Sequence, residues 1–244
     1  MAASHNAALS CCRPPDAVSR ETVRHPSAAF HVKRDPLQQF LDVITDAAQR
    51  LVADKSPEAL AEHVIDARNS LPLLVGETGP LIDVGTGAGF PGVPLLIDCP
   101  ELSGVLLDSR ARRCEHLQEV VDRCELRDRV EVVNLRVEEY AHGAGREAFG
   151  IAVARALAPP PVAIELCLPL LRPGGVFVIH AGTVDAEQLE QAAQALGGTV
   201  EQVVPVAGFA HRSQVVIRKL GPTPEQYPRR ANAIAREPLV RPAD

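Results

Sequence analysis

The chain has 244 residues, 46% hydrophobic side chains and a formal net charge of −6. This length supports one well-buried core, and the negative charge requires any contact with nucleic acid to come from local basic patches. No apolar run approaches the roughly 20 residues of a membrane helix, and no secretory signal opens the sequence. The six cysteines show no zinc-like spacing. We therefore expect a cytoplasmic, metal-free, monomeric protein without membrane attachment.

The first 75 residues divide into a tail and a helical segment. Residues 1–34 lack apolar periodicity, which predicts a disordered tail. In residues 35–75, apolar positions recur at helical spacing from Leu37 to Leu51 and again from Ser56 to Leu71. Two amphipathic helices are therefore expected before the main domain.

Residues 76–220 show short apolar runs separated by helical stretches, a pattern typical of parallel strands joined by crossover helices. The expected strands cover residues 81–84, 104–107, 130–134, 150–154 and 175–179. The expected helices cover residues 112–124, 161–171 and 185–196, and residues 199–206 and 213–219 suit an antiparallel edge hairpin. These elements predict an α/β fold, a Rossmann-like class I methyltransferase sheet of five parallel strands plus that hairpin. A basic Pro/Arg-rich tail follows at residues 221–244.

A glycine-rich segment lies where the first of these strands should end. It runs from Asp83 to Gly92 and includes Gly85, Gly87 and Gly89. Ligands of open α/β sheets bind outside the carboxyl ends of the strands, and glycine allows close approach of a ligand to the backbone. The segment therefore predicts binding of a nucleotide-like cofactor.

Two cofactors compete for this loop. The spacing of Gly87, Gly89 and Gly92 matches the GxGxxG pattern of dinucleotide binders. However, Pro91 interrupts the expected start of a helix, and the Asp83 carboxylate would repel a pyrophosphate while attracting the ammonium group of a methionine moiety. S-adenosylmethionine is therefore favoured over NAD.

A second acid, Asp108, ends the second expected strand. A carboxylate there can accept hydrogen bonds from both ribose hydroxyls, which both cofactors contain. Its alternative role is to cap the helix that begins near Arg110. Asp108 therefore supports a ribose-containing cofactor without selecting one.

Several motifs resemble those of one family. They are the Phe-Pro-Gly-Val-Pro extension of the loop at 90–94, residues 106–109 with 112–113, 136–139, Ala154-Arg155-Ala156 and the PEQYPRR sequence at 224–230. From about residue 63 to 239 the chain resembles the RsmG (GidB) methyltransferases, which methylate N7 of a guanine in 16S ribosomal RNA with S-adenosylmethionine. The expected partner is that RNA or the assembling 30S particle.

The resemblance implies roles for particular residues. Gly85 and Phe90 would contact the cofactor, Val137 and Glu138 would lie at its adenine, and Arg155 would lie in the pocket. Phe90 can instead be a core residue, Glu138 a solvated acid at a helix start, and Arg155 the partner of a buried acid. Because guanine N7 carries no proton, no general base is required, and Arg155 is only a candidate for positioning.

The substrate side departs from the family pattern. Residues 53–57 replace an Asn-Leu-Thr motif, and Glu62 replaces a basic residue before His63. Ala181 replaces a lysine, and a packed or solvated role is favoured for the neighbouring His180. The RNA-binding candidates are Arg229 and Arg230. These departures leave several alternatives open. The protein can be a methyltransferase for a small molecule or another RNA, a non-catalytic S-adenosylmethionine-binding protein, or an NAD-dependent dehydrogenase.

Overall fold

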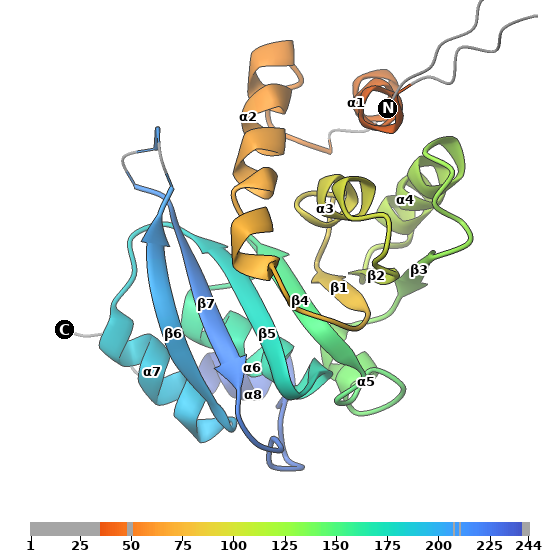
Figure 1. Ribbon diagram of the computed structural model, residues 1–244. Helices are drawn as coiled ribbons and strands as arrows, with labels where there is room; N and C mark the ends of the chain where they lie inside the picture. The colour runs from red at the N-terminus through yellow and green to blue at the C-terminus, as the bar shows by residue number, and fades with distance from the viewer. Residues whose placement is uncertain (1–34, 48–50, 207, 210, 241–244) are drawn as a thin grey trace, which may run out of the picture. The chain divides into compact units, whose positions relative to one another are not determined.

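The fold is organised around one seven-stranded sheet with the strand order β3-β2-β1-β4-β5-β7-β6 (Figure 1). The computed structural model describes residues 35–47, 51–206, 208–209 and 211–240. The tail expected at residues 1–34 lies outside the described residues. Among the described residues, no helix combines the length and apolar character that crossing a membrane requires.

The strands confirm the expected α/β arrangement. Five parallel strands come first: β1 (Leu81–Val84), β2 (Gly104–Asp108), β3 (Val130–Asn134), β4 (Phe149–Arg155) and β5 (Leu171–Ala181). The hairpin of β6 (Gly198–Pro205) and β7 (Ser213–Lys219) then joins the β5 edge through antiparallel pairing of β7. The order reverses between β1 and β4, and ligands of open α/β sheets bind at the carboxyl ends of strands beside such a switch point.

The main linking helices also match the expectation. They are α4 (Ala111–Arg123), α6 (Pro160–Cys167) and α7 (Ala186–Ala195). The predicted C-terminal end of the helix over 161–171 is wrong, because residues Leu168–Leu170 form the short 3₁₀ helix η2 and β5 begins at Leu171. Pro169 has no N–H to continue the helical hydrogen bonds.

Three short helices are not among those for which the sequence predicted bounds: α3 (Gly92–Asp98), α5 (Val137–Ala141) and α8 (Ala231–Arg236). Each has seven residues or fewer, too short to show a helical period. In α3 the first five residues are all buried, so its sequence resembles a buried strand as much as a helix. Sequence periodicity therefore could not identify these elements.

The two N-terminal helices are α1 (Pro36–Asp46) and α2 (Pro57–Arg68), with the 3₁₀ helix η1 (Leu71–Leu74) after them. Each helix starts with proline after a capping side chain: Asp35 accepts from the Leu37 amide and Ser56 from the Ala59 amide. Both helices expected from the sequence are therefore present, although α1 ends at Asp46 rather than at Leu51.

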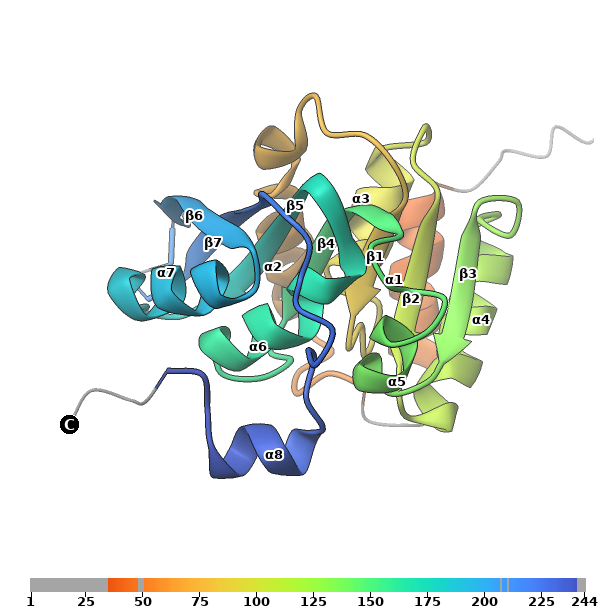
Figure 2. The same ribbon diagram turned by 90° about the horizontal axis from the view of Figure 1, so that it is seen from below.

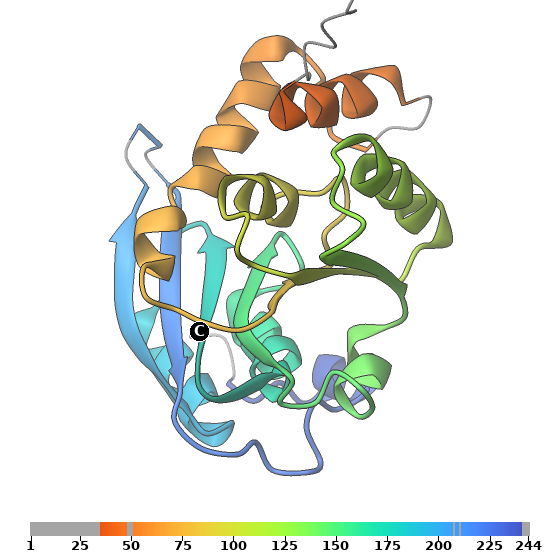
Figure 3. The same cartoon turned by 45° about the vertical axis from the view of Figure 1, so that its right-hand side comes forward.

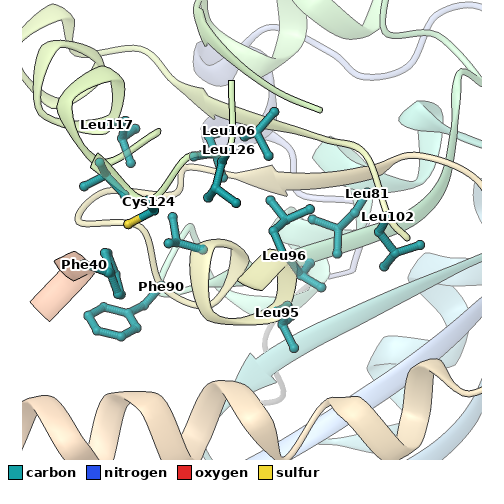
Figure 4. Close-up of a cluster of buried hydrophobic side chains, with 14 of the residues drawn as sticks. Phe40, Leu81, Phe90, Leu95, Leu96, Leu102, Leu106, Leu117, Cys124 and Leu126 are labelled. Atoms are coloured by element: carbon teal, nitrogen blue, oxygen red, sulfur yellow. The ribbon is translucent and has the colours of Figure 1, made fainter. Parts of the chain in front are cut away.

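Two hydrophobic clusters hold the helices to opposite faces of the sheet, as Figure 3 shows for α1 to α4 on one face and α5 to α8 on the other. Strand β1 contributes side chains to both clusters, because Leu81 faces the first cluster and Ile82 faces the second. In the first cluster the rings of Phe40 and Phe90 meet edge to face, with centroids 4.9 Å apart (Figure 4). This contact fixes α1 against the glycine-rich loop.

Candidate cofactor and substrate site

The glycine-rich loop connects β1 to α3 in a conformation that requires glycine. Gly85, Gly87 and Gly89 have φ values of +69°, +61° and +108°, in the left-handed region that side chains disfavour. A Cβ atom at Gly85 would also lie 2.7 Å from Leu157. The predicted loop conformation is therefore present at the carboxyl end of β1.

Asp83 stabilises this loop from inside the protein. Its side chain is fully buried, and Oδ2 accepts hydrogen bonds from the Gly92 amide at 2.9 Å and the Thr86 hydroxyl at 2.5 Å. These bonds connect the two ends of the loop. The other oxygen, Oδ1, is buried and has no hydrogen-bond partner.

Burial raises the pKa of Asp83 from its ordinary 3.8 to about 6, against the opposing effect of the two hydrogen bonds. Because the folded-state pKa lies above the unfolded value, the contribution to stability is full below pH 4 and is lost as pH rises through 6. From pH 4 to pH 7 we expect the wild type to lose about 2 to 3 kcal/mol of unfolding free energy relative to Asp83→Asn.

Urea unfolding at both pH values measures this difference. Asp128→Asn is the control, because Asp128 is exposed in the turn before β3. A stability difference between wild type and Asp83→Asn that stays constant with pH would contradict the raised pKa of Asp83.

Gly92 leaves the Asp83 carboxylate just enough room. A Cβ atom at Gly92 would lie 2.6 Å from both Cβ and Oδ2 of Asp83. We expect Gly92→Ala to lower the free energy of unfolding by about 1 to 3 kcal/mol, because the added methyl group displaces a buried acid. Gly143→Ala is the matched control, since the nearest atom to its Cβ lies at 3.5 Å. Equal stability of the two variants in urea unfolding would refute this packing argument.

A cavity of about 580 Å³ opens at the carboxyl ends of β1, β2 and β3. Gly85, Asp108, Val137 and Glu138 all line it. The Asp108 carboxylate is only 4% exposed and accepts hydrogen bonds from the amides of Gly87 and Arg110, at 3.1 and 2.9 Å. The four residues, which the sequence singled out in three separate segments, therefore meet around one cavity.

Arg113 also contacts Asp108, with Nη1 of the guanidinium 3.2 Å from Oδ2. The helix that follows begins at Ala111 with Arg110 as its N-cap, so Asp108 does not occupy the cap position itself. The amide and guanidinium contacts hold the carboxylate in place at the end of β2.

Not every expected cofactor residue lies on this cavity. Asp83 is buried beneath the loop and hydrogen-bonds to it, and Phe90 is 3% exposed and packs against Phe40. Neither residue lines the cavity. Leu135, which the sequence did not single out, does line it and is 43% exposed. Together with Val137, this side chain gives the cavity an apolar surface beside the Asp108 carboxylate.

A second cavity, of about 550 Å³, lies at the carboxyl ends of β4 and β5. It shares residues 156–158 with the first cavity, so the two adjoin along this segment. Its polar lining includes His63, Asp66, Arg155, His180 and Arg212. These side chains come from α2, β4, β5 and the β6–β7 turn region.

An ion pair forms the centre of that polar lining. Arg155 Nη1 lies 3.4 Å from Asp66 Oδ2 and donates to His63 Nδ1 at 3.1 Å. Its guanidinium also lies over the Phe90 ring, 5.2 Å from the centroid. The alternative that Arg155 pairs with a buried acid is therefore confirmed, and the acid is Asp66.

His180 is a packed residue, which is one of the two roles that the sequence favoured for it. It is 8% exposed, and its Nδ1 and Nε2 atoms lie 3.3 Å from Asp66 Oδ2 and 2.8 Å from Ser70 Oγ. The Gln214 amide on β7 donates to the Asp66 carbonyl and the Ser70 hydroxyl. Nothing in the sequence pattern had indicated Ser70 or Gln214, because this network joins α2 to strands more than 100 residues away.

Charge and burial set the protonation states in this network. Burial would raise the pKa of Asp66, but the hydrogen bond from His180 and the charges of His180 and Arg155 hold it below its ordinary value. Burial, followed by the charges of Arg155 and Arg212, lowers the pKa of His63. At neutral pH an anionic Asp66 therefore faces cationic Arg155 beside a neutral His63.

The two RNA-binding candidates lie in different surroundings. Arg229 binds the buried acid Glu165 through its amide, Nε and Nη2, at 3.0, 2.8 and 2.7 Å. Arg230 is exposed and lines a surface pocket together with Arg136. The Arg229 guanidinium is therefore engaged in an internal contact, whereas Arg230 faces solvent.

The first cavity fits the nucleoside half of S-adenosylmethionine on its own features. It combines an acceptor-only carboxylate, Asp108, with the apolar side chains of Leu135 and Val137, which suits a ribose joined to a flat base. Among the described residues, no group of three or more His, Cys, Asp or Glu could hold a metal ion.

The sheet order, the glycine-rich turn after β1 and the acid at the end of β2 define a class I methyltransferase fold. Solved structures share it: mitomycin 7-O-methyltransferase MmcR has a TM-score of 0.53 and 16% identity, covering 76% of this chain and 67% of that one. The glycopeptide N-methyltransferase MtfA, complexed with sinefungin, has a TM-score of 0.52 and 14% identity, covering 64% and 93%.

The chain belongs to the rRNA small subunit methyltransferase G family (GidB), whose model matches residues 33–216. Relatives with the name ribosomal RNA small subunit methyltransferase G support this assignment. That of Acetivibrio thermocellus is 36% identical, covering 84% of this chain and 88% of the relative. That of Syntrophomonas wolfei is 38% identical, covering 83% and 98%. The family expected from the motifs is therefore confirmed.

Proposed function

We propose that this protein transfers a methyl group from S-adenosylmethionine to N7 of a guanine in 16S ribosomal RNA. The observation that carries the proposal is the match to the family of small-subunit rRNA methyltransferases over most of the chain. The two adjoining cavities at the carboxyl ends of the strands support it, because one suits the cofactor and the other a substrate base. This substrate implies a cytoplasmic site of action.

The chain's own residues would hold the cofactor at the first cavity. Asp108 would accept hydrogen bonds from the ribose hydroxyls, Val137 and Glu138 would lie at the adenine, and the backbone of the loop at Gly85 would accommodate the methionine end. S-adenosylmethionine supplies a methyl group on a positively charged sulfur. Asp83 would act through the loop, since its carboxylate is fully buried.

The substrate residues have a positioning task. Guanine N7 is an acceptor without a proton, so attack on the methyl group requires alignment and no general base. Well-oriented reactants gain roughly 7 to 11 kcal/mol. Arg155, fixed by Asp66 and His63 beside the second cavity, can donate to the neighbouring O6 of guanine and leave N7 free.

RNA contact would rest on local cations. Arg230 and Arg136 are exposed beside the first cavity, and Arg212 lines the second. Ala181, where the family usually has lysine, also lines the second cavity, so one cation is missing there. We propose that the protein acts as a monomer on the RNA or on the assembling 30S particle.

The decisive experiment incubates the protein with labelled S-adenosylmethionine and 30S particles isolated without this modification, and then maps the labelled nucleotide. Asp108→Asn is the matched inactive variant, because it keeps the side-chain shape and removes the charge. Label at a guanine N7 with the wild type alone supports the proposal. RNA binding should also weaken steeply with rising salt.

Other outcomes identify the alternatives. Label at another RNA position, or methylation of a small molecule without salt dependence, would assign a different substrate. Absence of label, with S-adenosylhomocysteine still bound, would indicate a non-catalytic binding protein. A thermal shift with NAD and none with S-adenosylhomocysteine would instead support the dehydrogenase alternative.

A further inference from the structure

The C-terminal segment of residues 221–240 returns across the molecule after β7. Figure 2 shows it running from the end of β7 to α8, which lies near α5 and α6. The match to the family model ends at residue 216, so that comparison assigns no role to this segment. Its contacts with the rest of the fold indicate one.

Several contacts hold the segment before α8 begins. Arg146 donates to the carbonyls of Thr223 and Tyr227, each at 2.7 Å. His142 Nε2 lies 2.8 Å from the Pro228 carbonyl oxygen. Arg229 binds Glu165, whose side chain is only 1% exposed. Because Glu165 is buried and fully engaged by Arg229, this ion pair fixes the start of α8 on α6.

Helix α8 then forms part of the cofactor cavity. Ala231, Ile234, Ala235 and Pro238 all line it, together with Asp108 and the residues 135–138 that follow β3. Ile234 is 4% exposed and belongs to the hydrophobic cluster on this face of the sheet. The cavity is therefore bounded by an apolar wall that comes from the C-terminal segment.

We propose that α8 forms a wall for the adenine nucleoside of the cofactor, with Ile234 as the largest apolar side chain of that wall. A flat, weakly polar base gains most from apolar side chains around it, while a few polar groups set its orientation. Leu135 and Val137 supply apolar surface after β3, and Ile234 supplies it from α8. Leu135 is 43% exposed, and a bound base would cover it.

This inference rests on the proposed use of S-adenosylmethionine and adds a binding element to that site. It also separates the roles of neighbouring residues in the segment. Arg229 anchors the segment, Ile234 belongs to the wall of the cavity, and the exposed Arg230 stays available for RNA.

The test measures binding of S-adenosylhomocysteine to full-length variants by calorimetry. Ile234→Asp places an unpaired charge on the wall and is expected to raise the dissociation constant about tenfold or more, and Ile234→Ala about threefold. Arg236→Gln, at an exposed position of the same helix that does not line the cavity, should stay within about twofold. Melting temperatures without ligand show whether each variant is folded.

Hydrogen exchange of the wild type gives an independent measurement that needs no variant. S-adenosylhomocysteine should slow exchange in the peptide that contains α8 and leave the peptide of α7 unchanged. If folded Ile234→Asp binds like the wild type, or if exchange in α8 is unchanged, and Asp108→Ala still weakens binding, the wall is refuted. Failure of the wild type itself to bind would instead refute the proposed function, and the wall with it.

Discussion

Asp108→Ala is expected to raise the dissociation constant for S-adenosylhomocysteine about a hundredfold or more. The carboxylate is 4% exposed and is already held by the amides of Gly87 and Arg110 and by Arg113, so it is oriented before the cofactor arrives. Each hydrogen bond from a ribose hydroxyl to a charged acceptor is worth about 1.5 to 3 kcal/mol, and two are lost together. Calorimetry with the full chain measures the change.

Asp128→Ala is the control, because it removes an exposed acid that does not line the cavity. Since Asp108 also contacts the loop amides, the unliganded melting temperature has to be measured alongside the affinity. Affinity within about threefold of the wild type in a folded Asp108→Ala would mean that the ribose lies elsewhere.

Asp66→Ala is expected to lower the free energy of unfolding by about 3 to 5 kcal/mol. Asp66 is 4% exposed and is the acid that Arg155 and His180 share. Its removal leaves the Arg155 guanidinium, which has only 20% of its side chain exposed, without an opposite charge. Urea unfolding at pH 7 measures the loss.

Asp98→Ala is the matched control, because Asp98 also forms an ion pair with a residue of α2, namely Arg68. This pair lies at the surface, with 21% of the Asp98 side chain and 44% of the Arg68 side chain exposed. Such a pair contributes about 1 kcal/mol or less. The lowered pKa of Asp66 also gives a pH dependence: its contribution is present above its ordinary pKa of 3.8 and is lost as pH falls through the folded-state value. Equal losses for the two variants would show that the Asp66 network is not structural.

The parallel sheet could be predicted because each buried strand leaves a local pattern. Residues 81–84 and 104–108 are buried at every position, and a strand buried on both faces reads as a continuous apolar run. The helices α4 and α7 were predictable for the same reason, since their amphipathic period spans several turns. Helices α3, α5 and α8 escaped prediction because they are too short to show a period.

The cofactor half of the site was predictable because its residues follow strands. The carboxyl ends of parallel strands meet at one edge of the sheet, so Gly85 after β1, Asp108 at the end of β2 and Val137 after β3 were expected to lie together, and one cavity joins them. The same spacing could not show that Phe90 points into the core. A loop residue's direction depends on what packs around it, here Phe40 of α1.

The sequence by itself determined the fold class, the glycine-rich loop and the family, since each depends on residue types at short spacing. Only the tertiary structure decided the partners of the charged side chains. Arg155 meets Asp66 across 89 positions of sequence, and Arg229 meets Glu165 across 64. Such pairs form when separate elements pack, because a charge leaving water needs an opposite charge from whichever neighbour the fold supplies. No local pattern records that neighbour.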